Sequence, residues 1–181
     1  MNPWWQEVVD TLRSEFSDIT DASQLTRVTV RLVIAALLGG ILGFERERKG
    51  KAAGVRTHML VCMGAALFVL VPRLAGANDA DLSRVVQGIV AGIGFLGAGT
   101  ILKGETLNTH QVKGLTTAAG LWMTAAIGIA AGMGREATAV LSTILALGIL
   151  SLMPMIVAHF ETQQSEKDSV ARNTGGDSRE P

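Results

Sequence analysis

Five long apolar segments dominate this chain of 181 residues. At 1.5 Å of rise per residue, each is long enough to cross most or all of a hydrocarbon core about 30 Å thick as a helix. Only 18% of the residues are charged, against about 25% in a typical soluble domain. The sequence therefore predicts an all-α fold, a polytopic bundle of about five transmembrane helices. The predicted spans are residues 28–44, 57–74, 85–102, 114–131 and 137–157.

An amphipathic helix precedes the first span, over about residues 2–19. Trp4, Trp5 and further apolar residues fall on one face of this helix, opposite charged ones. Adjacent tryptophans suit a membrane interface, where an indole keeps its N–H hydrated. We expect an interfacial helix, with a helix that packs on a partner as the alternative.

The composition divides the chain into three parts. We expect an interfacial amino-terminal segment over residues 1–26 and a transmembrane domain over residues 27–158. After Phe160 the chain is polar, with glycine, serine and mixed charge but no aromatic residue. Such a composition is typical of disorder, so we expect residues 159–181 to be a disordered cytoplasmic tail.

Basic residues predict the orientation. The segment ERERKGKAAGVR, residues 45–56, is by far the densest basic cluster near a membrane end. The positive-inside rule places this segment in the cytoplasm. Alternation of the spans then puts the amino terminus outside, in the periplasm, and the carboxyl terminus in the cytoplasm.

The third span, VVQGIVAGIGFLGAGTIL, contains the spacing of a dinucleotide-binding turn at Gly92, Gly94 and Gly97. Such a turn needs a β-strand before it and an acidic residue about 20 positions later. Here the preceding residues belong to the same apolar run, and no carboxylate stands near position 112. The context therefore argues against a nucleotide site.

Two interpretations of these glycines remain. Small residues four positions apart let helix backbones approach closely in lipid. The first, third and fourth spans carry this pattern, which predicts that they form the tight centre of the bundle. The glycine density through Gly99 alternatively marks a broken helix beside a polar cavity. The small-residue pairs are Gly39 and Gly43, Gly88 and Gly92, Gly114 and Ala118, and Gly128 and Gly132.

Polar side chains at membrane depth are few. No Asp or Glu lies near the middle of a span, which removes the usual proton- or sodium-coupling group. We expect Arg31 to extend toward the outer headgroups. The polar and indole-bearing residues at depth are Arg31, Gln87, Thr100, Thr116, Thr117, Trp122, Thr124 and Thr143.

Charged residues at three helix ends meet on the predicted cytoplasmic face. A cluster of Glu45, Arg46, Arg56, Lys103 and Glu105 is geometrically reasonable there, with Thr57 next to Arg56. The alternative is ordinary snorkelling of side chains at helix ends. We expect snorkelling for Arg48, Lys49 and Lys51.

Motifs of enzyme chemistry are missing from the sequence. There is no phosphate loop and no HExxH motif, and the pair His58 and Cys62 is too small a set to form a metal site. A net charge of zero argues against nucleic acid as a partner. We expect no enzyme activity, no cofactor and no bound metal.

Three blocks of the chain together resemble the MgtC/SapB family of bacterial membrane proteins. They are RLVIAALLGGILGFERERKGKAAGVRTHMLVCMGAALF, GIVAGIGFLGAGTIL and VKGLTTAAGLWMTAAIGIAAGMG, and they cover about residues 27–155 in the family's order and spacing. The residues of this chain within the family blocks are Glu45, Arg46, Gly54, Arg56, Thr57, Gly92, Gly94, Phe95, Gly97, Gly99, Thr100, Gly114, Thr116, Thr117, Ala118 and Trp122.

The resemblance implies a five-helix protein of the bacterial inner membrane. Some relatives support growth in low magnesium, acid tolerance and survival in host cells, and the best-studied ones are implicated in restraining the ATP synthase. Virulence-type members carry a soluble carboxy-terminal domain, where this chain has only its short tail. The expected function is regulation of a membrane complex such as the ATP synthase, with a channel or carrier for a cation such as Mg²⁺ or a small solute as the alternative. The expected partners are the lipid bilayer, such a complex, and a second copy bound through small-residue helix faces.

Candidate functional residues follow from the polar groups, the glycines and the family blocks. They are Glu45, Arg46, Arg56, Thr57, Gln87, Gly92, Gly94, Gly97, Gly99, Thr100, Lys103, Glu105, Thr116, Thr117 and Trp122.

Overall fold

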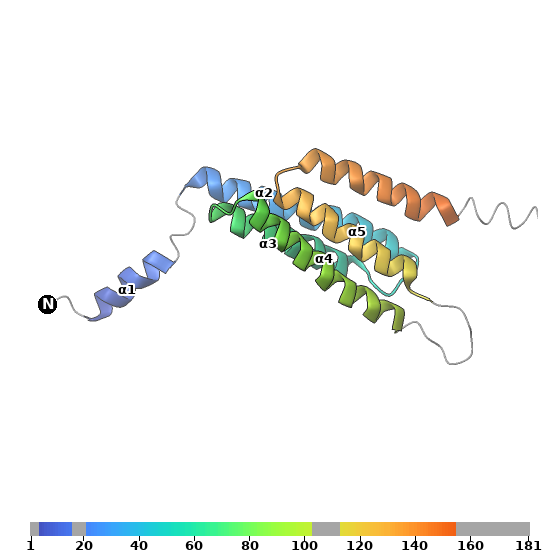
Figure 1. The fold of residues 1–181 in the computed structure, drawn as a ribbon, viewed down its shortest axis with the longest axis horizontal. Coiled ribbons are helices and arrows are strands. Elements are labelled where there is room, and N and C mark those ends of the chain that lie inside the picture. The colour runs from blue at the N-terminus through green and yellow to red at the C-terminus, as the bar shows by residue number, and fades with distance from the viewer. Residues whose placement is uncertain (1–3, 16–20, 103–112, 155–181) are drawn as a thin grey trace, which may run out of the picture.

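The computed structural model describes residues 4–15, 21–102 and 113–154, and these residues form helices and short connections with no strand among them. Five of the helices are long and apolar enough to cross a membrane, which confirms the predicted fold class. The helix from residue 136, which carries no label in Figure 1, is called the last helix below. The helices are α1 (Trp4–Glu15), α2 (Ala22–Arg48), α3 (Val55–Leu74), α4 (Asp79–Leu102), α5 (Leu115–Gly132) and the last helix (Glu136–Pro154).

Two spans begin earlier than their apolar runs, because polar side chains cap them. Asp21 accepts a hydrogen bond from the Ser23 amide and starts α2. Asn78 accepts from the amides of Ala80 and Asp81 and starts α4. Hydropathy detects the apolar part of a span, whereas the cap sets where its first turn begins.

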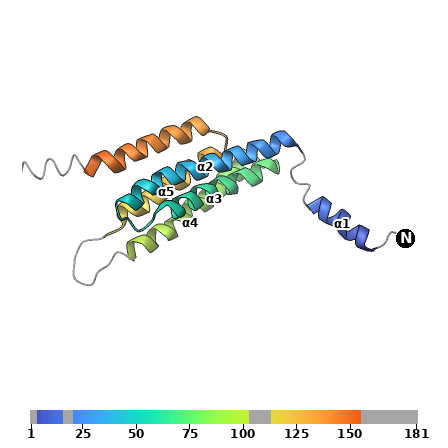
Figure 2. The ribbon, with the colours of Figure 1, turned by 180° about the vertical axis from the view of Figure 1, so that it is seen from behind.

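Helix α3 lies at the centre of the bundle. It packs against α2, α5 and α4, while α4, among the labelled helices, packs only against α5 and α3 (Figures 1 and 2). The prediction that the first, third and fourth spans form the tight centre was therefore wrong for the third span, α4, whereas the fourth, α5, packs against α2, α3 and α4. The glycine pattern identified faces that allow close approach, but it could not say which helix each face meets.

On one side, α2 approaches the backbone of α3 through two glycines. A Cβ placed on Gly39 would lie 2.5 Å from the main-chain oxygen of His58. A Cβ on Gly43 would lie 2.6 Å from the Cα atom of Val55. Only glycine fits at such distances, so the first small-residue pair makes the α2–α3 contact.

On another side, α5 approaches α3 in the same way. A Cβ on Gly128 would overlap the main-chain oxygen of Cys62, and one on Gly132 would overlap that of Ala66. The second small-residue pair of the fourth span therefore makes the α3–α5 contact. The last helix adds Ala139 and Ala146 to the core cluster that residues of α2, α3 and α5 form.

Helix α4 runs unbroken from Asp79 to Leu102, so the interpretation of a broken helix was wrong. Of its glycines, Gly97 alone lies close to another described helix, with a Cβ there 3.3 Å from the Cβ of Ala118. The pair Gly88 and Gly92 makes no such contact. Only 11% of the most apolar window of α4 is buried, against 50% for α5, so α4 presents most of its surface outward.

Helix α1 contributes no residue to the buried core, and both views show it apart from the other helices (Figures 1 and 2). It covers the central part of the predicted amphipathic helix. Its place at a membrane interface stays a prediction, as do the domain boundaries. The predicted tail and the segment 103–112 lie outside the described residues.

Candidate functional site

A buried charge cluster stands where α2 ends, next to the loop of residues 49–54, called the basic loop below. Arg46 Nη1 lies 3.4 Å from Glu45 Oε2, and Lys49 Nζ lies 2.5 Å from Glu45 Oε1. The side chain of Arg46 is only 3% exposed and that of Glu45 13%. Burying these charges is costly unless they pair. Because the pairs form only when the last turn of α2 is in place, they hold that turn in its helical conformation.

The basic loop folds back onto this cluster. The amide of Lys51 donates to the main-chain oxygen of Arg46, 3.0 Å away. Glu47 Oε2 accepts from the amide of Val55 at 2.8 Å and so caps α3. Sequence reasoning missed Glu47, although a signal existed: Gly54 at the cap position has no side chain to satisfy the first amides of α3.

The predicted cluster forms only in part. The structure brings Glu45 and Arg46 together, but Arg56 and Thr57 are exposed, and the described residues provide no ion pair to Arg56. Lys103 and Glu105 lie outside the described residues. Lys49 joins the cluster instead of Arg56, because it stands one helical turn after Glu45, on the same face of α2.

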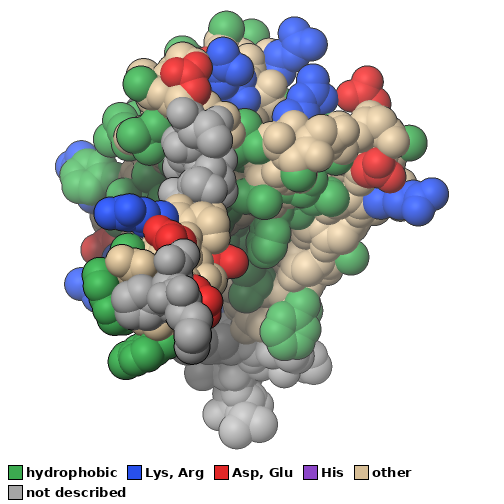
Figure 3. All heavy atoms as spheres, turned by 90° about the vertical axis from the view of Figure 1, so that its left-hand side faces the viewer, with side chains coloured by type: hydrophobic (Ala, Val, Ile, Leu, Met, Phe, Trp, Pro, Cys, Tyr) green, Lys and Arg blue, Asp and Glu red, His purple; other side chains and the backbone are tan. Residues whose placement is uncertain are grey.

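Lys49, just after α2, and Arg31, in the first half of that helix, both bind backbone oxygens. Lys49 Nζ donates to the main-chain oxygen of Leu150 at 2.8 Å, in the last helix. Arg31 Nη1 donates to that of Gly132 at 3.2 Å, and its Nε lies 3.6 Å from Glu136 Oε1. Both side chains have backbone partners that sequence reasoning missed, because free carbonyls at helix ends are within their reach, and their extension toward headgroups stays a prediction. Figure 3 shows the molecule from the side on which α1 lies, with acidic and basic side chains on this surface.

A cavity of about 480 Å³ opens between α5 and the last helix and is called the His58 cavity below. His58 is 1% exposed, and its Nδ1 lies 3.0 Å from the main-chain oxygen of Gly54. Of the predicted residues, Thr116 and Trp122 line this cavity, while Thr117 is buried. The lining residues are Leu42, His58, Thr116, Ala119, Gly120, Trp122, Met123, Leu145, Ala146, Ile149 and Leu150.

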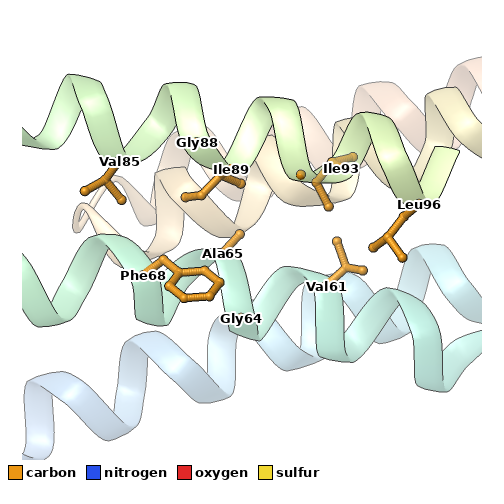
Figure 4. Close-up of a pocket in the computed structure, with 10 residues that line it drawn as sticks. Val61, Gly64, Ala65, Phe68, Val85, Gly88, Ile89, Ile93 and Leu96 are labelled. Atoms are coloured by element: carbon orange, nitrogen blue, oxygen red, sulfur yellow. The ribbon is translucent and has the colours of Figure 1, made fainter. Parts of the chain in front are cut away.

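A second cavity, also about 480 Å³, lies between α3 and α4 and is called the α4 groove below (Figure 4). Every residue that lines it is apolar or glycine. Gly92 lies on its wall, while Gly94 and Gly99 are exposed and Thr100 donates to the main-chain oxygen of Gly97 at 2.8 Å. The lining residues are Val61, Gly64, Ala65, Phe68, Val85, Gly88, Ile89, Gly92, Ile93 and Leu96.

The outward surface of α4 combines glycine with a polar side chain. Gln87 is exposed within the apolar run of the helix, and Phe95 is 82% exposed. A Cβ on Gly94 or Gly99 would meet no described atom within 4 Å, apart from its own helix. Among the described residues, no three His, Cys, Asp or Glu side chains are grouped to hold a metal ion.

Comparison with known proteins decides the family. The MgtC family model matches residues 32–159, which is most of the chain. The chain belongs to the MgtC family. This multi-pass membrane protein is 44% identical to SrpB of Synechococcus elongatus over 68% of its own length and 73% of SrpB.

Two further relatives are longer proteins. The chain is 39% identical to YhiD of Escherichia coli K12, whose name proposes a magnesium transporter, over 68% of the chain and 59% of YhiD. It is 42% identical to MgtC of Brucella abortus over 77% of the chain and 56% of that protein. The match therefore spans less than two thirds of these two relatives. No solved structure matches the chain.

Proposed function

We propose that this MgtC-family protein is a non-enzymatic regulator of the bacterial inner membrane. It supports adaptation to low magnesium or acid by helix–helix contact with a membrane complex such as the ATP synthase. The outward surface of α4, made by Gln87, Gly94, Phe95 and Gly99, supplies the contact. The exposure of this surface is the observation that carries the proposal.

The chemistry of that surface suits another helix better than it suits lipid. An amide in hydrocarbon without a hydrogen bond costs roughly 2–7 kcal/mol, so Gln87 favours a polar partner. Exposed glycines at Gly94 and Gly99 let a second backbone approach closely, as the inner glycines do toward α3. Within the described chain, Gln87 has no hydrogen-bond partner, and no other helix approaches Gly94 or Gly99. A partner helix packed on this surface would supply both contacts.

A carrier for a cation is the second candidate, because the name of YhiD proposes magnesium transport. Gly97 is the position to test, since it holds α4 against Ala118. Selective Mg²⁺ flux into proteoliposomes that contain the purified chain alone, abolished by Gly97→Leu, would establish the carrier and overturn the regulator as the primary account. Absence of flux together with co-purification of a membrane complex would support the regulator.

The regulator is tested with a pair of matched substitutions at open glycines. Gly94→Leu adds bulk to the contact surface of α4, whereas Gly148→Leu adds the same bulk to the last helix. At both positions a Cβ meets no described atom outside its own helix, so we expect the two variants to fold alike, which their amounts in the membrane check.

We expect Gly94→Leu to lose co-purification with the ATP synthase and growth in low magnesium or at acid pH. The Gly148→Leu chain should retain both. Equal retention by the two variants, at equal amounts of protein in the membrane, would contradict the proposal.

A further inference from the structure

A ring nitrogen of His58, one of the residues that line the His58 cavity with Thr116 and Trp122, accepts no hydrogen bond from the described chain. The main-chain oxygen of Gly54 can only accept, so His58 Nδ1, 3.0 Å away, carries the proton of that hydrogen bond. In the neutral ring, Nε2 then has a free lone pair. No described residue donates a hydrogen bond to it.

This acceptor faces the cavity. A Cβ placed on Gly120 would lie 3.8 Å from His58 Nε2, and both residues line the cavity. The ring itself is 1% exposed, so the cavity gives the nitrogen its access. An acceptor in an apolar site favours a ligand that donates a hydrogen bond.

The rest of the cavity suits an alkyl body. Its volume of about 480 Å³ lies within the roughly 300–1,000 Å³ of small-molecule sites. Leucine, isoleucine, methionine, alanine and tryptophan side chains supply most of the lining. Three of the lining residues, Trp122, Leu145 and Ile149, are more than half exposed, so the cavity opens on the side that meets lipid.

We propose that the His58 cavity binds a membrane-soluble molecule with an alkyl body and a hydroxyl group, whose O–H donates to His58 Nε2. The α4 groove has the same volume, but its lining is only apolar side chains and glycine. It therefore offers no side chain that could form a hydrogen bond with a ligand. Two sources share the required chemistry, a long-chain alcohol and an alkyl phenol. This inference stands independently of the role proposed for α4.

Fluorescence of Trp122 tests the proposal in the full chain reconstituted in nanodiscs. Trp122 is one of three tryptophans, so a Trp4→Phe, Trp5→Phe background leaves it as the sole indole. The probes are a twelve-carbon alcohol with a terminal bromine, a brominated alkyl phenol, and the methyl ether of each. Bromine quenches the indole, and the ether has a methyl group in place of the hydroxyl hydrogen, so it keeps an acceptor oxygen but has no donor.

We expect each hydroxyl probe that binds to do so about 2–10-fold more tightly than its ether, the range that one net hydrogen bond gives. The tighter of the two hydroxyl probes identifies the source of the ligand. In His58→Leu the preference for hydroxyl over ether should vanish. Equal binding of hydroxyl and ether probes to the unaltered His58 chain would overturn the proposal.

Because His58 also binds the start of α3, a second variant tests the cavity without touching that hydrogen bond. Gly120→Val fills the space next to Nε2, and Gly64→Val makes the same change in the α4 groove, where a Cβ meets no described atom outside its own helix. Gly120→Val should weaken hydroxyl-probe binding at least 10-fold and Gly64→Val should not. Equal binding by these two variants would also overturn the proposal.

Discussion

The guanidinium of Arg31 donates a hydrogen bond to the main-chain oxygen of Gly132, 3.2 Å away, across 101 positions of sequence. The same side chain lies 3.6 Å from Glu136 and is 20% exposed. It thereby ties the first span to the turn between α5 and the last helix. A Cβ on Gly134, at the centre of that turn, would overlap the Arg31 guanidinium, so the turn is shaped around this arginine.

Replacing Arg31 by methionine should destabilise the bundle by about 1–3 kcal/mol. The change leaves a carbonyl at the end of α5 and the carboxylate of Glu136 without their cation. Unfolding of the purified chain in mixed micelles, with increasing denaturing detergent, measures the loss. Arg27→Met, on the exposed first turns of the same helix, is the control and should unfold like the unaltered chain.

Gly128→Leu should destabilise the bundle by at least about 1–3 kcal/mol, since its side chain would overlap the backbone of α3 at Cys62. The same unfolding assay measures this. Gly148→Leu, at an open glycine of the last helix, should have little effect. Equal stability of the two variants would show that α5 does not pack on α3 as described.

The sequence predicted the number and the apolar part of the spans, because hydropathy reports directly on the energy of placing each segment in lipid, but it missed the capped first turns of α2 and α4. It did not predict their neighbours. Gly39 and Gly128 lie on small-residue faces that fit any closely approaching helix, and only the folded chain shows that both meet α3. The partners of Lys49 and Arg31 were missed for a related reason: they are backbone oxygens far along the chain, which carry no side-chain signal.

The amino-terminal cap of α2 should be sensitive to acid. The side-chain and main-chain hydrogen bonds from Ser23 lower the pKa of Asp21 below its ordinary value of 3.8. A lowered pKa in the folded state means that the stabilising contribution is present above the ordinary value and is lost as the pH falls through the folded value.

Protection of the Ser23 amide from hydrogen exchange measures this loss. Protection should fall between the ordinary pKa of an aspartate and the lower value of Asp21. In Asp21→Asn, which keeps an acceptor but does not titrate, protection should vary less over that range. A fall in protection that begins well above the ordinary pKa would contradict the assignment.

The orientation predicted from the basic loop is tested by a single cysteine. Cys62, the one native cysteine, is buried, so the unaltered chain is a control that should not react. Lys51→Cys places an exposed thiol on the basic loop. An impermeant maleimide should label this thiol in inside-out vesicles and not in intact cells, and labelling from outside intact cells would reverse the orientation.

The regulator account depends most on a partner meeting the outward surface of α4. A photo-cross-linking benzoylphenylalanine in place of Phe95, which is 82% exposed, probes this surface in cells grown in low magnesium. Ile144, which is 60% exposed on the last helix, is the matched control position. The account predicts an adduct with an ATP synthase subunit from position 95 and none from position 144. Adducts with a second copy alone, no adduct from position 95, or equal adducts from both positions would contradict it.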